Sequence, residues 1–133
     1  MLRYLLDTNI AITVLRSRSA AVGQRFVEAR GQLAISAISV AELAYGAEKS
    51  AQPPQNHHAV EEFLALLEVL PFDAPAAAHS GQIRAALTAV GAPIGSYDTL
   101  IAGHARSRGL VVVTDNIREF ERVPALLVED WLA

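Results

Sequence analysis

The segment that decides the fold lies almost at the N-terminus, where residues 3–9 read Arg3-Tyr4-Leu5-Leu6-Asp7-Thr8-Asn9. Its apolar part, residues 2–6, predicts a short buried strand. Thr8 or Asn9 is then expected to cap a helix that runs to about residue 16. Asp7 would therefore lie where a strand ends and a helix begins. In an open α/β sheet, this position faces the crevice in which ligands bind.

The remainder of the chain continues the alternation of strands and helices. Strands are predicted at residues 33–36, 69–72, 110–114 and 125–128, and Pro71 restricts the second of these to a sheet edge. Helices are predicted at residues 19–30, 40–49, 76–90, 97–107 and 117–122, and a helical stripe lies within residues 58–70. Ser19, Ser39 and Ser96 are the expected caps, and residues 50–56 and 91–95 the expected loops.

This order of elements predicts a three-layer α/β sandwich, in which a mostly parallel twisted sheet has helices on both faces. The run Leu110-Val111-Val112-Val113-Thr114 is apolar throughout, which is typical of an interior parallel strand. With 133 residues and no internal repeat, the chain is expected to form one domain over residues 1–133.

Composition excludes several classes of protein. The charge-free stretches are interrupted well before the roughly 18 apolar residues that a membrane helix needs, so no membrane association is expected. The absence of cysteine removes disulfides and thiolate metal sites, and a cytoplasmic location is the expectation. A net charge of −3 argues against sequence-independent binding of nucleic acid through many phosphate contacts.

Four acidic residues lie near predicted helix starts: Asp7, Glu42, Asp98 and Glu119. Each has an ordinary structural explanation, since a helix N-terminus favours a carboxylate by roughly 0.3–1 kcal/mol. Glu42 in particular completes a capping box with Ser39. However, the predicted topology would bring several of these helix starts to one crevice, where capping alone would not explain the accumulation of charge.

Such a cluster needs a neutralising partner. Two carboxylates about 4 Å apart repel by roughly 4 kcal/mol at an effective dielectric constant of about 20. With no cysteine and no pair of histidines suitably spaced on a helix, the available ligands are hard oxygens, which favour Mg²⁺ or Mn²⁺ over zinc. A Mg²⁺ ion held by carboxylates is a common arrangement for phosphodiester hydrolysis.

Four segments resemble, in order, the signature blocks of PIN-domain ribonucleases: residues 5–9, 36–46, 97–102 and 113–120. More narrowly, the chain is similar to the VapC-type toxins of bacterial VapBC toxin–antitoxin pairs. This resemblance implies a PIN-like fold and a Mg²⁺-dependent endoribonuclease, with Mn²⁺ as a possible substitute, that hydrolyses structured RNA such as tRNA by means of a metal-activated water.

The resemblance also implies roles for individual residues. Asp7, Glu42, Asp98 and Glu119 would be catalytic, and Asp7 and Asp98 would bind the metal directly. The fourth block leaves Glu119, Asn116 and Asp115 as alternatives for the last position, with Glu119 favoured. The residues expected to orient these acids are Thr8, Asn9, Ser96, Thr114 and Asn116.

The same resemblance implies partners: an RNA substrate, a VapB-type antitoxin that covers the active-site groove, and a homodimer that can form a larger assembly with the antitoxin. Two alternatives stay open, namely a PIN-fold ribonuclease of RNA processing outside a toxin–antitoxin pair and a non-catalytic PIN-like binding module. A phosphatase also places an aspartate after its first strand, but it would require a second aspartate where this chain has Asn9.

Other candidate residues have weaker patterns. The histidines at positions 57, 58, 79 and 104 show no metal-site spacing and are interpreted as surface or packing residues, the first two in a proline-rich loop. Arg84, Arg118 and Arg122 are interpreted as solvated charges. Tyr45 and Tyr97 flank two of the acids and could either stack on an RNA base or pack in the core.

Overall fold

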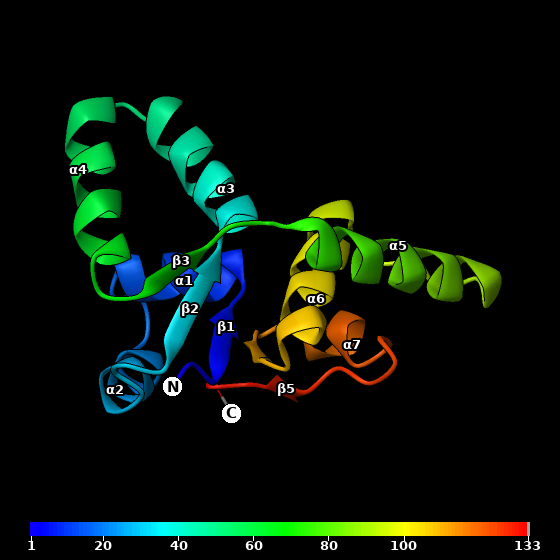
Figure 1. The fold of residues 1–133 in the computed structure, drawn as a ribbon. Helices are drawn as coiled ribbons and strands as arrows, with labels where there is room; N and C mark the ends of the chain where they lie inside the picture. The colour runs from blue at the N-terminus through cyan, green and yellow to red at the C-terminus, as the bar shows by residue number, and fades with distance from the viewer. Residues whose placement is uncertain (133) are drawn as a thin grey trace.

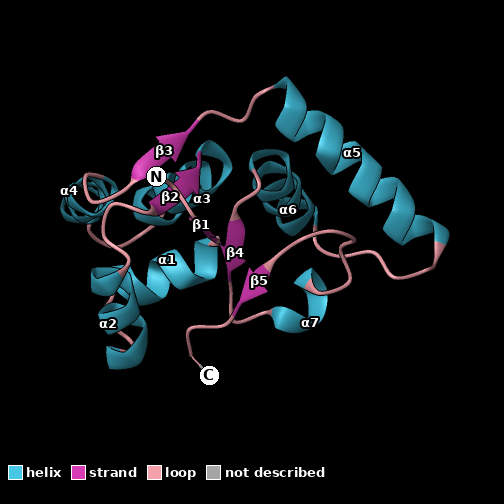
Figure 2. Cartoon of the chain, turned by 60° about the horizontal axis from the view of Figure 1, so that its bottom comes forward, coloured by secondary structure: helices cyan, strands magenta, loops and turns pink. Residues whose placement is uncertain are grey.

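Five short strands form the centre of the fold, and each pairing between them is parallel. The computed structural model describes residues 1–132. The strands are β1 (Tyr4–Leu6), β2 (Leu33–Ser36), β3 (Glu68–Leu70), β4 (Val111–Val113) and β5 (Val128–Glu129). Their order in the sheet is β3-β2-β1-β4-β5, so β1 is central and β3 is an edge strand (Figure 2).

Helices connect the strands and cover both faces of the sheet (Figures 1 and 2). They are α1 (Thr8–Leu15), α2 (Ala20–Glu28), α3 (Ala37–Glu48), α4 (Pro53–Leu64), α5 (Ala74–Ala89), α6 (Ser96–Arg108) and α7 (Ile117–Phe120). This arrangement confirms the predicted three-layer α/β class. Within residues 1–132, no helix combines the length and the apolar character that crossing a bilayer requires.

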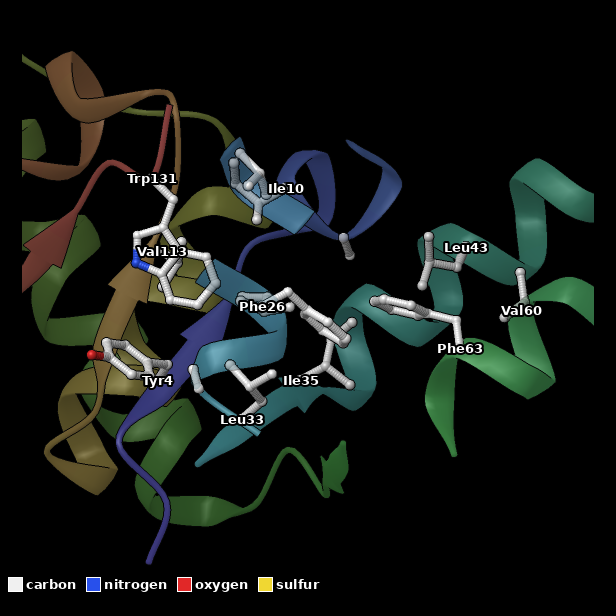
Figure 3. Close-up of a cluster of buried hydrophobic side chains, with 14 of the residues drawn as sticks. Tyr4, Ile10, Phe26, Leu33, Ile35, Leu43, Val60, Phe63, Val113 and Trp131 are labelled. Carbon is white, nitrogen blue, oxygen red and sulfur yellow. The ribbon is translucent and has the colours of Figure 1, made fainter. Parts of the chain in front are cut away.

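The first buried apolar cluster packs α1 to α4 against one face of the sheet (Figure 3). Leu6 and Ile35 contribute from the strands, and the stacked rings of Phe26 and Phe63, 5.8 Å apart, join α2 to α4. The second cluster packs α5, α6 and α7 against the opposite face, where Leu5 points. Because neighbouring strand residues point to opposite faces and both faces are covered, the interior strands β1, β2 and β4 are mostly apolar without alternation.

Helices α5 and α6 approach each other unusually closely at Gly103. A Cβ atom at that position would lie 2.0 Å from the Ser80 Oγ and 2.6 Å from the Ser80 backbone nitrogen. Glycine is therefore needed to place α6, which carries Asp98, against α5.

Three predicted helix caps were wrong. Asp7, rather than Thr8 or Asn9, caps α1. Ser36, rather than Ser39, caps α3, because its hydroxyl accepts from the Ile38 amide at 3.1 Å. The predicted capping box is therefore absent, and Glu42 lies beyond the first turn. At α6 the cap position is taken by the backbone of Gly95, and Ser96 is the first helical residue.

Other boundaries also differ from the prediction. Helix α4 begins at Pro53, inside the segment predicted as a loop. Amide hydrogens in the first turn of a helix have no partner within the helix, so proline, which has no amide hydrogen, is well suited to this position. The final strand lies at Val128–Glu129 rather than at residues 125–128. Ala125 has a positive φ of 62°, which is incompatible with an extended strand.

Candidate active site

Asp7 lies at the carboxyl end of the central strand and is almost fully buried, with 2% of its surface exposed. One carboxylate oxygen accepts the Ile10 amide at 2.8 Å, and the other accepts the Thr114 hydroxyl at 2.5 Å. The strand registers pair Leu6 with both Ile35 and Val113, so the next residues, Ser36 and Thr114, flank Asp7. Asp7 is thus held on one side by the first turn of α1, through Ile10, and on the other by Thr114 at the end of β4.

The environment of Asp7 disfavours its charge. Burial raises the pKa of Asp7 from 3.8 to about 6, the hydrogen bonds from Thr114 and Ile10 oppose this rise, and the negative charges of Asp115 and Glu42 add to it. A buried carboxylate with such a pKa gains from a nearby cation, because a positive charge would offset the burial and the like charges that disfavour its ionised form.

Glu42 is held by the Thr8 hydroxyl, which in turn contacts the Ser39 hydroxyl. The Thr8 hydroxyl donates to Glu42 Oε1 at 2.6 Å, and the Thr8 Oγ1 lies 2.9 Å from the buried Ser39 Oγ. Since the single hydrogen of Thr8 is directed to the glutamate, Ser39 donates to Thr8. The predicted orienting role of Thr8 agrees with this contact. Ser39 was interpreted only as a helix cap, and no sequence signal distinguishes that role from the observed one.

Asp98 lies beside Glu119, whose carboxyl group acts on it both as a hydrogen-bond partner and as a negative charge. The pKa of Asp98 is raised from 3.8 to about 7, chiefly by burial, then by the hydrogen bond and negative charge of Glu119, with smaller contributions from Asp7 and Glu42. Two carboxyls form such a bond only when one of them keeps its proton. The Asn116 amide donates to Glu119 Oε2 at 2.9 Å, which fixes the second partner.

The four predicted acids are therefore brought into one electrostatically linked group. The ion pairs within residues 1–132 join other residues, so no basic side chain neutralises these acids there. Among residues 1–132, no group of three histidine, cysteine, aspartate or glutamate side chains is arranged so that it could hold a metal ion. The donor set is nevertheless all oxygen and carries excess negative charge, which fits a hard divalent cation once the side chains turn toward it.

The predicted orienting residues differ in their positions. Thr114 contacts Asp7, and Asn116 contacts Glu119, so both are placed where an orienting role requires them. Asn9 and Ser96 are exposed, and within residues 1–132 no side-chain hydrogen bond joins either of them to the four acids. Asp115 is exposed and affects Asp7 through its charge.

Several secondary candidates are also placed by the structure. Tyr45 and Tyr97 are 66% and 55% exposed, so the core-packing alternative for them was wrong. His57 and His58 lie in α4 rather than in a loop and pair with Glu48 and Glu62 at the surface. The remaining candidates fit their surface or packing interpretation: Arg84, Arg118 and Arg122 are exposed, His79 accepts a hydrogen bond from Arg106, and His104 is buried.

A cavity of about 270 Å³ lies beside the acidic cluster, between α1, α3 and α4. Glu42 and Arg16 contribute charged groups to its wall, and Ile12, Leu43 and Val60 contribute apolar surface. The site is thus continuous with a mostly apolar groove.

Comparisons with known proteins agree with this geometry. The PIN domain family model matches residues 4–126. The chain is 51% identical over 131 residues to the "tRNA(fMet)-specific endonuclease VapC" of Shigella flexneri, covering 98% of this chain and 99% of the relative. It is 48% identical over 132 residues to "Ribonuclease VapC2" of Haemophilus influenzae, covering 99% and 100%.

Solved structures give the same result. A chain of the DNA-bound VapBC complex from Salmonella typhimurium superposes with a TM-score of 0.95 at 51% identity, over 98% of this chain and 99% of that one. A chain of the VapBC2 complex from Rickettsia felis, bound to a promoter DNA fragment, superposes with a TM-score of 0.92 at 36% identity, with the same coverage. The chain therefore belongs to the VapC family of PIN-domain ribonucleases, the toxins of VapBC toxin–antitoxin systems.

Proposed function

We propose that this VapC protein is a Mg²⁺-dependent endoribonuclease that hydrolyses a phosphodiester bond in tRNA. The observation that carries the proposal is the acidic cluster, in which segments from residue 7 to residue 119 bring four carboxyl groups together without a neutralising base. Such a cluster is costly for the fold unless it binds a cation.

Asp7 and Asp98 are the residues that would hold the ion, with Glu42 and Glu119 available for its water molecules or for a second ion. When bound, Mg²⁺ would make a water molecule acidic and stabilise the negative charge that develops on the phosphate. Thr114 orients Asp7, Thr8 orients Glu42, and Asn116 orients Glu119. Attack by water, rather than by the ribose 2′-hydroxyl, leaves a 5′-phosphate and a 3′-hydroxyl.

Initiator tRNA is the substrate that we propose, because the 51% identity to a tRNA(fMet)-specific endonuclease extends over nearly the whole chain. The exposed Tyr45 and Tyr97 stand on the helices that carry Glu42 and Asp98. Aromatic side chains in such positions can stack on unpaired bases, which is how proteins read single-stranded parts of RNA.

The test compares cleavage of initiator tRNA and of elongator methionine tRNA by the purified chain in Mg²⁺, in Mn²⁺ and in EDTA. Asp98→Asn, which keeps the shape of the side chain, is the inactive control. We expect metal-dependent cleavage of the initiator alone, with the stated product ends on mapping. Asp98→Asn should bind Mg²⁺ weakly, lose cleavage and remain folded.

Each part of the proposal can fail separately. Cleavage that persists in EDTA, or cyclic-phosphate ends, would contradict the metal-activated water. Equal cleavage of both tRNAs would contradict the substrate and leave the metal chemistry standing. A folded chain that cleaves no RNA under any of these conditions would favour the non-catalytic binding module.

We further propose that a VapB-type antitoxin neutralises the chain and that its segment lies in the groove between α1, α3 and α4, beside Glu42. The solved relatives are complexes of VapB with VapC, which supports this partner. Co-expression of a VapB-type antitoxin should relieve growth arrest caused by the chain and yield a stable complex. Light scattering of the free chain tests the proposed homodimer.

A further inference from the structure

His104 is a buried histidine with no place in the chemistry described above. It lies on α6, two turns beyond Asp98, and none of its surface is exposed. Its Nδ1 lies 2.8 Å from the Ser36 Oγ, and its Nε2 has no hydrogen-bond partner within residues 1–132. The Phe72 ring packs perpendicular to the imidazole, with the two ring centroids 5.4 Å apart.

This arrangement is unfavourable for stability considered alone. Burial lowers the pKa of His104, so the ring is neutral, and one of its nitrogens is desolvated without compensation. A leucine would fill similar space with no unpaired polar atom. Local choices that reduce stability are expected mainly where a function depends on them.

The contact made by the other nitrogen suggests such a function. Ser36 is fully buried, ends β2 and caps α3 by accepting the Ile38 amide. Its position in the sheet is beside Asp7. The His104–Ser36 contact therefore joins the helix that carries Asp98 to the start of the helix that carries Glu42.

We propose that His104 is a positioning residue: through Ser36 it holds the start of α3, and with it Glu42, in register with Asp7 and Asp98. The inference rests on the proposed nuclease function for its consequence in catalysis. The hydroxyl of Ser36 can rotate, and the imidazole, fixed between α6 and Phe72, selects the orientation that caps α3.

Two substitutions in the full-length chain separate positioning from packing. His104→Leu fills the space and removes the contact with Ser36. His104→Asn places an amide nitrogen where Nδ1 stands, so it can restore that contact while leaving a void. If His104 serves packing alone, the leucine variant should be both the more stable and the more active of the two. If His104 is a positioning residue, the asparagine variant should have the higher kcat although it is the less stable.

The measurements are urea unfolding, hydrogen exchange of the Ile38 amide, and kcat and KM for RNA. For His104→Leu we expect undiminished stability, Ile38 exchange faster by about tenfold, and kcat lower by about tenfold with little change in KM. For His104→Asn we expect lower stability than the leucine variant, with kcat and Ile38 exchange close to those of the unchanged chain.

Ser36→Ala combined with His104→Leu provides a further check, because residues that act through one another do not give additive losses. The double variant should lose no more kcat than Ser36→Ala alone. Unchanged Ile38 exchange in His104→Leu, or activity that follows stability in both histidine variants, would overturn the proposal. If the unchanged chain cleaves no RNA, the proposed function fails, and Ile38 exchange still decides whether His104 positions α3.

Discussion

Asp7 and Asp73 cap α1 and α5 with the same local geometry, yet they lie in very different surroundings. Each has an extended backbone and accepts the amide three residues later, Ile10 at 2.8 Å and Ala76 at 3.1 Å. Asp73 is exposed and follows the edge strand β3, whereas Asp7 is buried at the end of the central strand.

The difference shows that acting as a helix cap does not by itself make an aspartate a candidate metal ligand. What makes Asp7 a candidate metal ligand is its place in the sheet, where Thr114 holds it and where Glu42 and Asp115 contribute negative charge. The same side chain at the start of α5 only completes a helix end. Asp7 and Asp73 are therefore distinguished by the strand that each of them follows.

The largest expected effect separates the two caps directly. Asp7→Asn should lower RNA cleavage by roughly 10²- to 10³-fold, the scale of removing one preorganised electrostatic group from an active site. Asp73→Asn should leave cleavage unchanged, since asparagine caps a helix about as well as aspartate. Initial rates with each variant, at matched folded fractions, make the comparison. Similar losses in both would show that cap geometry, rather than sheet position, matters.

The second prediction concerns pH. The pKa values of Asp7 and Asp98 are raised from 3.8 to about 6 and about 7, so the folded chain keeps these protons to higher pH than the unfolded chain does. The free energy of unfolding without metal should therefore fall as pH rises from about 4 to about 7, and then level off. The shift at Asp7 corresponds to about 3 kcal/mol, and half-buried Asp98 contributes less.

Urea unfolding at a series of pH values, in EDTA and in saturating Mg²⁺, measures this dependence. Mg²⁺ should restore stability above pH 7, where the acids are ionised. The Asp7→Asn variant should show a flatter profile, while Asp73→Asn should retain the full slope. A profile that rises with pH in EDTA would contradict the assigned pKa directions.

The smallest expected effect concerns the contact between α5 and α6. It tests whether substitutions at this contact change the stability of the fold without abolishing RNA cleavage. Gly103→Ala places a methyl group against the Ser80 backbone and should destabilise the fold by about 1–3 kcal/mol. Gly81→Ala, on α5 with no atom within 4 Å of the added methyl, should instead stabilise it by roughly 0.5–1 kcal/mol. Thermal unfolding measures both, and both folded variants should still cleave RNA.

The sequence predicted the fold class and the acidic cluster because both depend on features that recur along the chain. Uninterrupted apolar strands indicated a covered parallel sheet, and an acid after a strand end indicated the crevice. The boundaries of the helices were less predictable. Ser36 and Ser39 are equally good helix caps in sequence, and the choice is decided by strand pairing, because Ser36 pairs with Leu70 at the end of β2. The Ser39–Thr8 contact and the His104–Ser36 contact join residues 31 and 68 positions apart, which no local pattern reports.

The wide spacing of the four acids has a consequence for biosynthesis. Asp7 emerges from the ribosome first, but its partner hydroxyl belongs to Thr114, and Glu119 follows later still. A nascent chain that lacks those residues has neither the fourth carboxylate nor the interior strand β4, which lies beside β1 in the sheet. The proposed nuclease would thus stay inactive until translation of its own chain is nearly complete.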